Sequence, residues 1–313
     1  MKTLVCYQID AFTSEPFGGN PAAVVLLPRS MLPLPDAVRQ AVAAEKNLSE
    51  TAFLECAGEE DDDNFSTCSR FRLRWFTPAI EVPLCGHATL ASAAALLFGE
   101  GNPAKQLTFE TLSGELRVSR CHEVTGSDGN SGDSTSSTGG SLSMDLPLVP
   151  ASAADVPPGM EAGSALVQAA AGDLPVREVL YAPGLRYLMV VLDAAARDAF
   201  LKLSPNSQRL GDAHTNGQLV GVIVSVQGDG ERHHFLSRFF APWAGIAEDP
   251  VTGSAHSVLG PYWAAALGTP RLRARQCSPR GGELGVEVRA EQGRVVVSGG
   301  AVTVFRGHLF LPD

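Results

Sequence analysis

Two glycines, each followed by a polar residue, mark the places in this sequence that could best do chemistry. Gly86 precedes His87 and Gly253 precedes Ser254, and each pair leads into a run of small and apolar residues. The first N–H groups of a helix have no partner inside it and can bind a carboxylate. We therefore expect an anion site built from both glycines. Alternatively, the glycines only form turns, Ser254 only caps a helix and His87 is structural.

Two carboxylates and one amide are further candidates. Glu50 precedes the hydrophobic segment Thr51–Glu55, where a carboxylate could be partly removed from water, as suits a general base. Asp249, just before Pro250, could act as an acid or base, or could only form a hydrogen-bonded turn. Asn20 lies in a loop rich in glycine and proline, where it could bind a ligand or occupy a turn.

Other chemistry is disfavoured by what the sequence lacks. The segments around Gly86 and Gly253 are similar, and in this repeat Cys85 aligns with Thr252. The chain therefore lacks the symmetric pair of thiols that could remove a proton from one face of a carbon and return it to the other. The 6 cysteines show no C-x-x-C or paired spacing, which indicates reduced thiols and no zinc site. No dinucleotide-binding or Walker motif is present. We expect neither a metal nor a cofactor.

The surroundings of the two glycines recur along the chain. Arg74–Pro78 precedes the first glycine, and Arg238–Pro242 precedes the second about 165 residues later. This repeat indicates two related halves, with an active site in the cleft between them. Ala88–Phe98 and Ala255–Leu267 are apolar or small nearly all round, which predicts helices buried on every side. Each half is therefore predicted to be an α+β domain whose strands surround one central helix.

Local patterns predict further elements and the domain limits. Asp36–Lys46 has the spacing of a surface helix, and Val295–Val297 and Val302–Phe305 have the composition of strands. The acidic residues at 59–63 indicate an exposed loop tip. The expected parts are an N-terminal domain, a flexible insertion rich in glycine and serine, a C-terminal domain and a final strand that could return to the first domain: 1–124, 125–141, 142–300 and 301–313.

The overall charge narrows the class of partner. With 24 basic and 34 acidic residues the formal net charge is −10, which argues against binding nucleic acid. No signal peptide or membrane-spanning run is recognisable. We expect a cytoplasmic protein that acts on a small molecule and does not bind membranes.

Several motifs together resemble one known family. Asp10–Thr13, Gly19–Ala22, Asn47–Thr51, Pro83–Thr89 and Glu248–Ala255 occur in the order found in the phenazine-biosynthesis PhzF-like isomerases. The resemblance covers nearly the whole chain. It implies the diaminopimelate epimerase-like fold, with two pseudo-symmetric domains that each form a β-barrel around a central buried helix, and commonly a homodimer.

The resemblance also implies an activity and a site. In PhzF itself, a glutamate that corresponds to Glu50 moves a hydrogen between carbons of a dihydro-hydroxyanthranilate ring without a cofactor. The supporting residues of the family correspond to His87, Asp249 and Ser254, and its ligand-contacting asparagine to Asn20. We therefore expect an isomerase that shifts a proton within a small carboxylate-bearing metabolite. An amino-acid racemase or epimerase of the same fold, or a non-catalytic binding protein, is the alternative.

Overall fold

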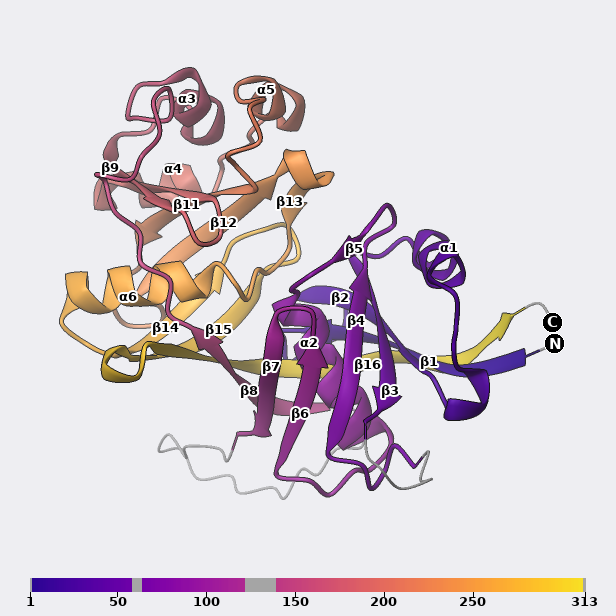
Figure 1. Cartoon of the computed structure of the whole chain (residues 1–313). Coiled ribbons are helices and arrows are strands. Elements are labelled where there is room, and N and C mark those ends of the chain that lie inside the picture. Colours follow the sequence, from indigo (N-terminus) through magenta and orange to yellow (C-terminus); the bar gives the residue numbers. More distant parts are fainter. Residues whose placement is uncertain (1, 58–63, 122–138, 312–313) are drawn as a thin grey trace. The chain divides into compact units, whose positions relative to one another are not determined.

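The chain forms two compact units. A computed structural model describes residues 2–57, 64–121 and 139–311, so the expected acidic loop and most of the expected insertion lie outside the described residues (Figure 1). Unit 1 contains Met1–Asp145 and Ser298–Asp313, and unit 2 contains Leu146–Val297. The domain limits expected from the sequence lie near these boundaries. They stay predictions, because compactness does not test independent folding.

Unit 1 is a closed barrel of eight strands. The strands follow the order β1-β2-β3-β4-β6-β7-β8-β16, and β16 also pairs with β1. Its elements are β1 (Lys2–Ala11), β2 (Asn20–Leu26), α1 (Asp36–Lys46), β3 (Glu50–Cys56), β4 (Arg70–Phe76), β5 (Glu81–Val82), α2 (Gly86–Ala94), β6 (Gln106–Thr111), β7 (Gly114–Arg120), β8 (Gly139–Pro147) and β16 (Arg294–Leu311). Gly139–Ser141, expected in the insertion, are thus part of a strand.

Helix α2 is the core of unit 1. All nine of its residues are buried, and a single π-helical turn, Ala95–Gly99, continues it. The helix contacts β1, β2, β3 and β7. Small side chains let the strands approach it closely, and this explains why the sequence is apolar on every face. The predicted central helix of the first half is confirmed, with its first residue at Gly86.

Helix α1 covers the outer face of the barrel and has the predicted limits. Pro35 precedes it, Asp36 lies in its first turn and Lys46 in its last, where each charge interacts favourably with the helix dipole. Asn47 ends the helix in the left-handed conformation, at φ 49°. This ending directs the chain into Ser49 and the start of β3.

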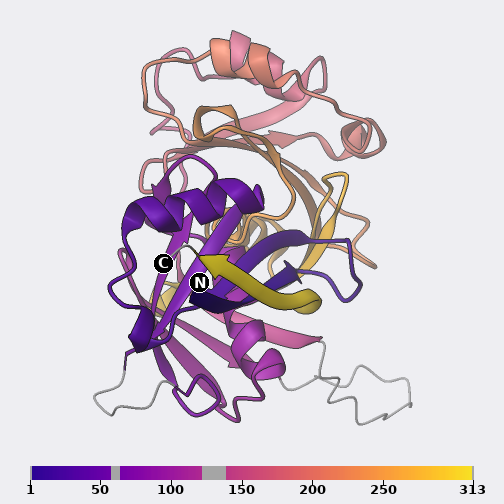
Figure 2. The same ribbon diagram turned by 90° about the vertical axis from the view of Figure 1, so that its right-hand side faces the viewer.

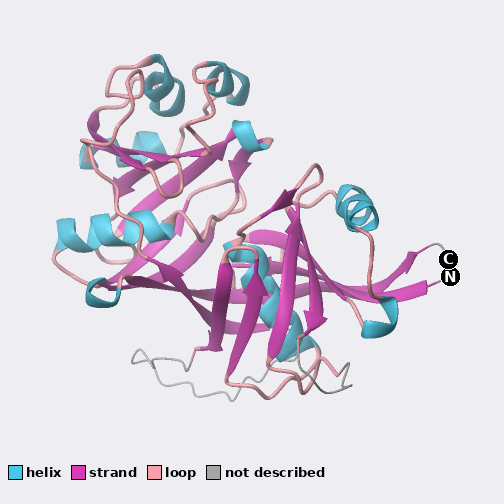
Figure 3. Cartoon of the chain, viewed as in Figure 1, coloured by secondary structure: helices cyan, strands magenta, loops and turns pink. Residues whose placement is uncertain are grey.

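Unit 2 repeats the order of elements in unit 1. The parallel pairing of β2 with β3 recurs between β10 and β11, and that of β4 with β6 recurs between β12 and β14. Strands predominate here too (Figure 3). The elements are α3 (Ala165–Ala171), β9 (Val176–Ala182), β10 (Tyr187–Leu192), α4 (Arg197–Phe200), α5 (Ser207–Asp212), β11 (Gly221–Gln227), β12 (Phe235–Ala241), β13 (Ile246–Asp249), α6 (His256–Leu267), β14 (Arg271–Gln276) and β15 (Gly282–Arg289).

Helix α6 differs from the expected helix in two ways. It begins at His256, after a turn formed by Gly253–Ala255, rather than at the glycine. Its first turns are buried against β14 and β15, but Ala265 and Ala266 are exposed. The expectation of burial on every side is therefore wrong for the second half of this helix. Alanine is compatible with either environment, so composition did not distinguish them.

The last strand is continuous where two strands were expected. β16 runs from Arg294 to Leu311, and its end lies beside the start of β1, with Lys2 paired to Leu311 (Figure 2). Glycines between the two expected strands do not form a turn. A Cβ on Gly300 would lie 2.4 Å from the carbonyl oxygen of Thr13, so glycine allows a close backbone approach here.

No helix among the described residues is both long and apolar enough to cross a membrane.

Candidate functional site

Three predicted site residues lie together in unit 1. Asn20 is the first residue of β2 and Glu50 the first of β3, and the parallel pairing of these strands brings the two positions to the same edge. His87 is the second residue of α2, inside the barrel. All three are buried, with no more than 7% of any residue exposed.

His87 lies between Asn20 and Glu50. Its Nδ1 is 3.1 Å from Nδ2 of Asn20, and its Nε2 is 3.1 Å from Oε2 of Glu50. The approach to Glu50 lacks the alignment of a hydrogen bond, so Oε2 of Glu50 is a buried oxygen without a hydrogen-bond partner among the described residues. An acceptor left in this state is available for a proton or a substrate group.

Ser49, which the motif analysis did not single out, completes a ring of hydrogen bonds. Its hydroxyl donates to Oδ1 of Asn20 at 3.0 Å and lies 3.2 Å from Nε2 of His87. In the neutral imidazole, Nδ1 can accept from Asn20 while Nε2–H donates to the Ser49 oxygen. Such a closed ring fixes the histidine tautomer and the orientation of its plane.

The surroundings of His87 favour its charged form. Burial opposes charge on the imidazole, but the nearby Cys85 and Glu50 outweigh it, and the pKa of His87 is raised well above 6.5. Burial raises the pKa of the Cys85 thiol to about 11, so this thiol is neutral near pH 7. Protonation of Nδ1 is accommodated when the Asn20 amide turns over, because Ser49 can then donate to the carbonyl of Pro21, 3.1 Å away.

Glu50, Cys85 and His87 have the residue types of a metal site. Their ligand atoms lie within 4.8 Å of one another, and all three residues are buried. However, His87 faces Cys85 with Nδ1, at 3.5 Å, and Glu50 with Nε2. One imidazole nitrogen cannot bind an ion held by both neighbours, so these contacts fit a hydrogen-bonded array better than a metal cage.

Asp249 lies at the end of β13 in unit 2 and is held by its neighbours. The hydroxyl of Thr252 donates to its carboxylate. The Gln276 side chain, fully buried, donates to the carbonyl of Asp249 at 2.7 Å and accepts from the Thr252 N–H at 2.8 Å. The segment is thus the hydrogen-bonded turn that was one of its two interpretations. A role of Asp249 as an acid or base is still compatible with this turn, because the turn orients the carboxylate.

Gly253 and Ser254 follow this turn but do not begin the helix. Ala255 is the residue that precedes α6, and no side chain caps it. The Ser254 hydroxyl instead lies 3.0 Å from the hydroxyl of Tyr187. The capping interpretation of Ser254 is therefore wrong, and the expected symmetry of two glycine-initiated helices holds only for Gly86.

Sequence reasoning missed three residues of these clusters. Ser49 belongs to the Asn47–Thr51 motif, so its neighbour Glu50 was the available signal. Tyr187 and Gln276 lie far from Ser254 and Asp249 in the sequence and reach them only through the fold. The expectation of one site shared by the two halves stays a prediction.

Comparison with known proteins identifies the family. Residues 9–307 match the PhzC-PhzF family model, "Phenazine biosynthesis-like protein". The chain belongs to this family. It is 43% identical over 311 residues to a human phenazine biosynthesis-like domain-containing protein, covering 98% of this chain and 99% of that one. It is 40% identical over 308 residues to an uncharacterized isomerase of Pseudomonas aeruginosa, with 98% and 99% covered.

Solved structures support the fold assignment. A PhzF-family protein of Enterococcus faecalis superposes with a TM-score of 0.78 at 35% identity, covering 99% of this chain and all of the other. A probable proline racemase of Agrobacterium radiobacter, at 13% identity and a TM-score of 0.59, shares the fold alone. The predicted family and the diaminopimelate epimerase-like α+β fold are confirmed. The expected homodimer and cytoplasmic location stay predictions.

Proposed function

We propose that this member of the PhzC-PhzF family is an isomerase that moves a proton between two carbons of a small carboxylate-bearing metabolite. The observation that carries the proposal is the buried Glu50, whose Oε2 has no hydrogen-bond partner among the described residues. A buried carboxylate in such a position can act as a general base. The isomerase name of a relative 40% identical to this chain supports the reaction class.

The reaction needs no oxidant or reductant. Glu50 takes a proton from a carbon next to an unsaturated or carbonyl group, and the C–H electron pair moves into the conjugated system. The same carboxyl group then returns the proton to another carbon of the molecule, so the double bonds shift and Glu50 is regenerated. Net composition and oxidation state are unchanged.

His87 stabilises the charge that develops in this step. Its Nε2 lies 3.1 Å from Glu50, and the ring of contacts with Ser49 and Asn20 keeps it there. A fixed donor in a dry site interacts more strongly with a developing anion than water does. The first N–H groups of α2, at Gly86, would hold the carboxylate of the metabolite.

Asp249, Gly253 and Ser254 enter the proposal through the family resemblance. Thr252 and Gln276 hold Asp249 in one orientation, and Tyr187 holds Ser254. We propose that Asp249 takes part in proton transfer and that Ser254, with the amide of Gly253, contacts the substrate.

The test is deuterium incorporation. Small carboxylates, including dihydro-hydroxyanthranilate and amino acids, are incubated in deuterium oxide with the wild-type protein and with Glu50→Gln, which keeps the shape and removes the base. A mass gain in one compound with wild type but not with the variant is the expected result. Equal incorporation by Glu50→Gln would refute its role.

Further measurements distinguish the proposed isomerase from an epimerase and from a binding protein. Ser92→Ala, on α2 but outside the ring of contacts, is a matched control and should exchange at the wild-type rate. Inversion at a stereocentre without migration of a double bond would identify an epimerase. No exchange in any compound, together with saturable binding of a protein partner by Glu50→Gln, would support a binding role.

A further inference from the structure

Unit 1 contains a pocket outside the cluster around Glu50 whose size and lining suit a second binding site. It has a volume of about 490 Å³, which is within the range of small-molecule sites. Cross-strand pairs of β3 and β4 form its floor, with Phe53 opposite Arg74 and Glu55 opposite Arg72. Leu32 and Pro33, in the segment before α1, and Arg39 of α1 complete the lining.

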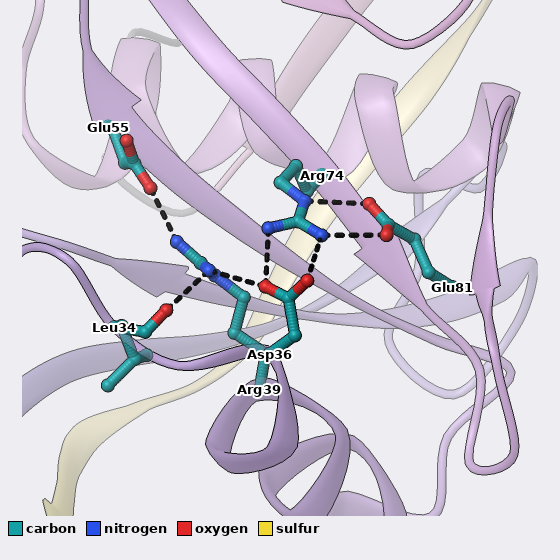
Figure 4. Close-up of polar contacts among 6 residues, drawn as sticks. All are labelled: Leu34, Asp36, Arg39, Glu55, Arg74 and Glu81. Atoms are coloured by element: carbon teal, nitrogen blue, oxygen red, sulfur yellow. Dashed lines mark hydrogen bonds and ion pairs between the residues drawn. The ribbon is translucent and has the colours of Figure 1, made fainter.

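The charged side chains around this pocket form an ordered network (Figure 4). Arg74 binds Glu81 and Asp36 with two contacts each, at 2.6–2.9 Å. Arg39 donates to the carbonyl of Leu34 at 2.6 Å and to Oε1 of Glu55 at 2.7 Å. Paired arginines of this kind are held in place before any ligand arrives.

Two charged groups of the lining, Arg72 and Glu55, remain available to a ligand, whereas the Nε of Arg39 is buried. The Nε of Arg39 is buried and has no hydrogen-bond partner among the described residues, although only 6% of this side chain is exposed. Arg72 is 62% exposed and only approaches Glu110, at 3.9 Å. Arg39 contacts only Oε1 of Glu55, which leaves Oε2 of Glu55 for a ligand. Arg72 and the second oxygen of Glu55 are therefore the charged groups that a ligand in the pocket can reach, while Arg39 holds Glu55 in place.

The balance of charge selects the kind of ligand. The network pairs Arg39 and Arg74 with the carboxylates Asp36, Glu55 and Glu81, and Arg72 beside it lies 3.9 Å from Glu110. A ligand with a large net charge would therefore be disfavoured. A ligand that carries both signs can offer a carboxylate to Arg72 and an ammonium group to Glu55. Leu32, Pro33 and Phe53 can contact its apolar side chain.

We propose that this pocket, lined by Arg39, Glu55 and Arg72, binds a free α-amino acid with a large apolar side chain. The site is distinct from the proposed catalytic cluster. Glu50 and Phe53 lie on opposite faces of β3, because side chains three residues apart on a strand point in opposite directions.

Calorimetric titration with phenylalanine tests the proposal. Two analogues dissect it: 3-phenylpropionate lacks the ammonium group, and phenethylamine lacks the carboxylate. We expect phenylalanine to bind in the micromolar to millimolar range, and each analogue at least about tenfold more weakly, as loss of a charged hydrogen bond predicts. The variant Arg72→Gln should weaken phenylalanine binding by a similar factor, and Arg72→Lys by less.

Matched variants locate the site. Arg117→Gln removes an exposed arginine elsewhere on unit 1, and Glu50→Gln alters the catalytic cluster; both should bind phenylalanine as the wild type does. Saturable binding that is unchanged in Arg72→Gln, or lost in Glu50→Gln, would overturn the assignment to this pocket. Absence of phenylalanine binding up to 10 mM would overturn the ligand class.

Discussion

Arg238 and Glu248 form a two-point ion pair that repeats, in unit 2, the pair between Arg74 and Glu81 in unit 1. In unit 2 the Nε–Oε1 and Nη2–Oε2 distances are 2.6 and 2.7 Å, and in unit 1 both are 2.7 Å. Each guanidinium also lies over the ring two residues later, Phe240 or Phe76. The sequence repeat is therefore conserved down to the geometry of single side chains.

The two pairs should differ in their contribution to stability. Only 7% of the Arg238 side chain is exposed, whereas Arg74 is 29% exposed and also binds Asp36. Glu248→Gln removes the carboxylate that balances the buried Arg238, which keeps its contact with the Leu203 carbonyl, and should lower the free energy of unfolding by about 3 kcal/mol. Glu81→Gln leaves Arg74 with Asp36 and should cost less than about 1 kcal/mol. Urea unfolding measures both; equal losses would contradict this account.

His256 should make stability depend on pH. Burial lowers the pKa of His256 to about 4, so the unfolded chain binds a proton near pH 6.5 that the folded chain does not. Stability is therefore lost as pH falls from about 6.5 to 4, by about 3 kcal/mol for this group. His256→Asn should lack this component, and the difference between wild type and variant over this pH range measures it. Parallel pH profiles would refute the prediction.

Gly19 should tolerate no side chain. It has φ +57°, and a Cβ would lie 2.1 Å from the carbonyl oxygen of Ala11. Gly19→Ala should therefore cost about 3 kcal/mol, through strain and displacement of β2, and should disturb Asn20. Gly101→Ala is the control: its φ is +68°, but no atom lies within 4 Å of the added Cβ. It should cost only about 1 kcal/mol. Thermal unfolding measures the loss of stability, and the rate of deuterium exchange into the substrate measures the disturbance of Asn20.

Ser49 should act through His87. Ser49→Ala removes the hydroxyl that contacts both Asn20 and Nε2 of His87. On the proposed function, the rate of deuterium exchange should fall about tenfold, with a shifted pH profile and little change in KM. A change in KM alone, or a wild-type pH profile, would mean that Ser49 does not position the histidine.

A structural feature can be predicted from the sequence when the residues that determine it are close together in the sequence. The limits of α1 follow from neighbours such as Pro35 and Asp36, and the start of α2 from Gly86. The late start of α6 depends on Thr252 and Gln276, which contact each other across 24 residues of sequence. Such contacts exist only in the folded chain. Glu50 and His87 stand in recognisable sequence motifs, whereas the residues that line the pocket around Arg39 come together only in the folded chain.

Strand β16 has a consequence for the order in which the protein can be assembled on the ribosome. Unit 1 consists of residues 1–145 and 298–313, and β1 pairs with β16 over Ala301–Leu311. Until those last residues have been translated, the first barrel lacks its closing strand and one edge of β1 is unpaired. An open strand edge invites association with other chains. A nascent chain that stalls before residue 298 is therefore expected to be a natural client of chaperones.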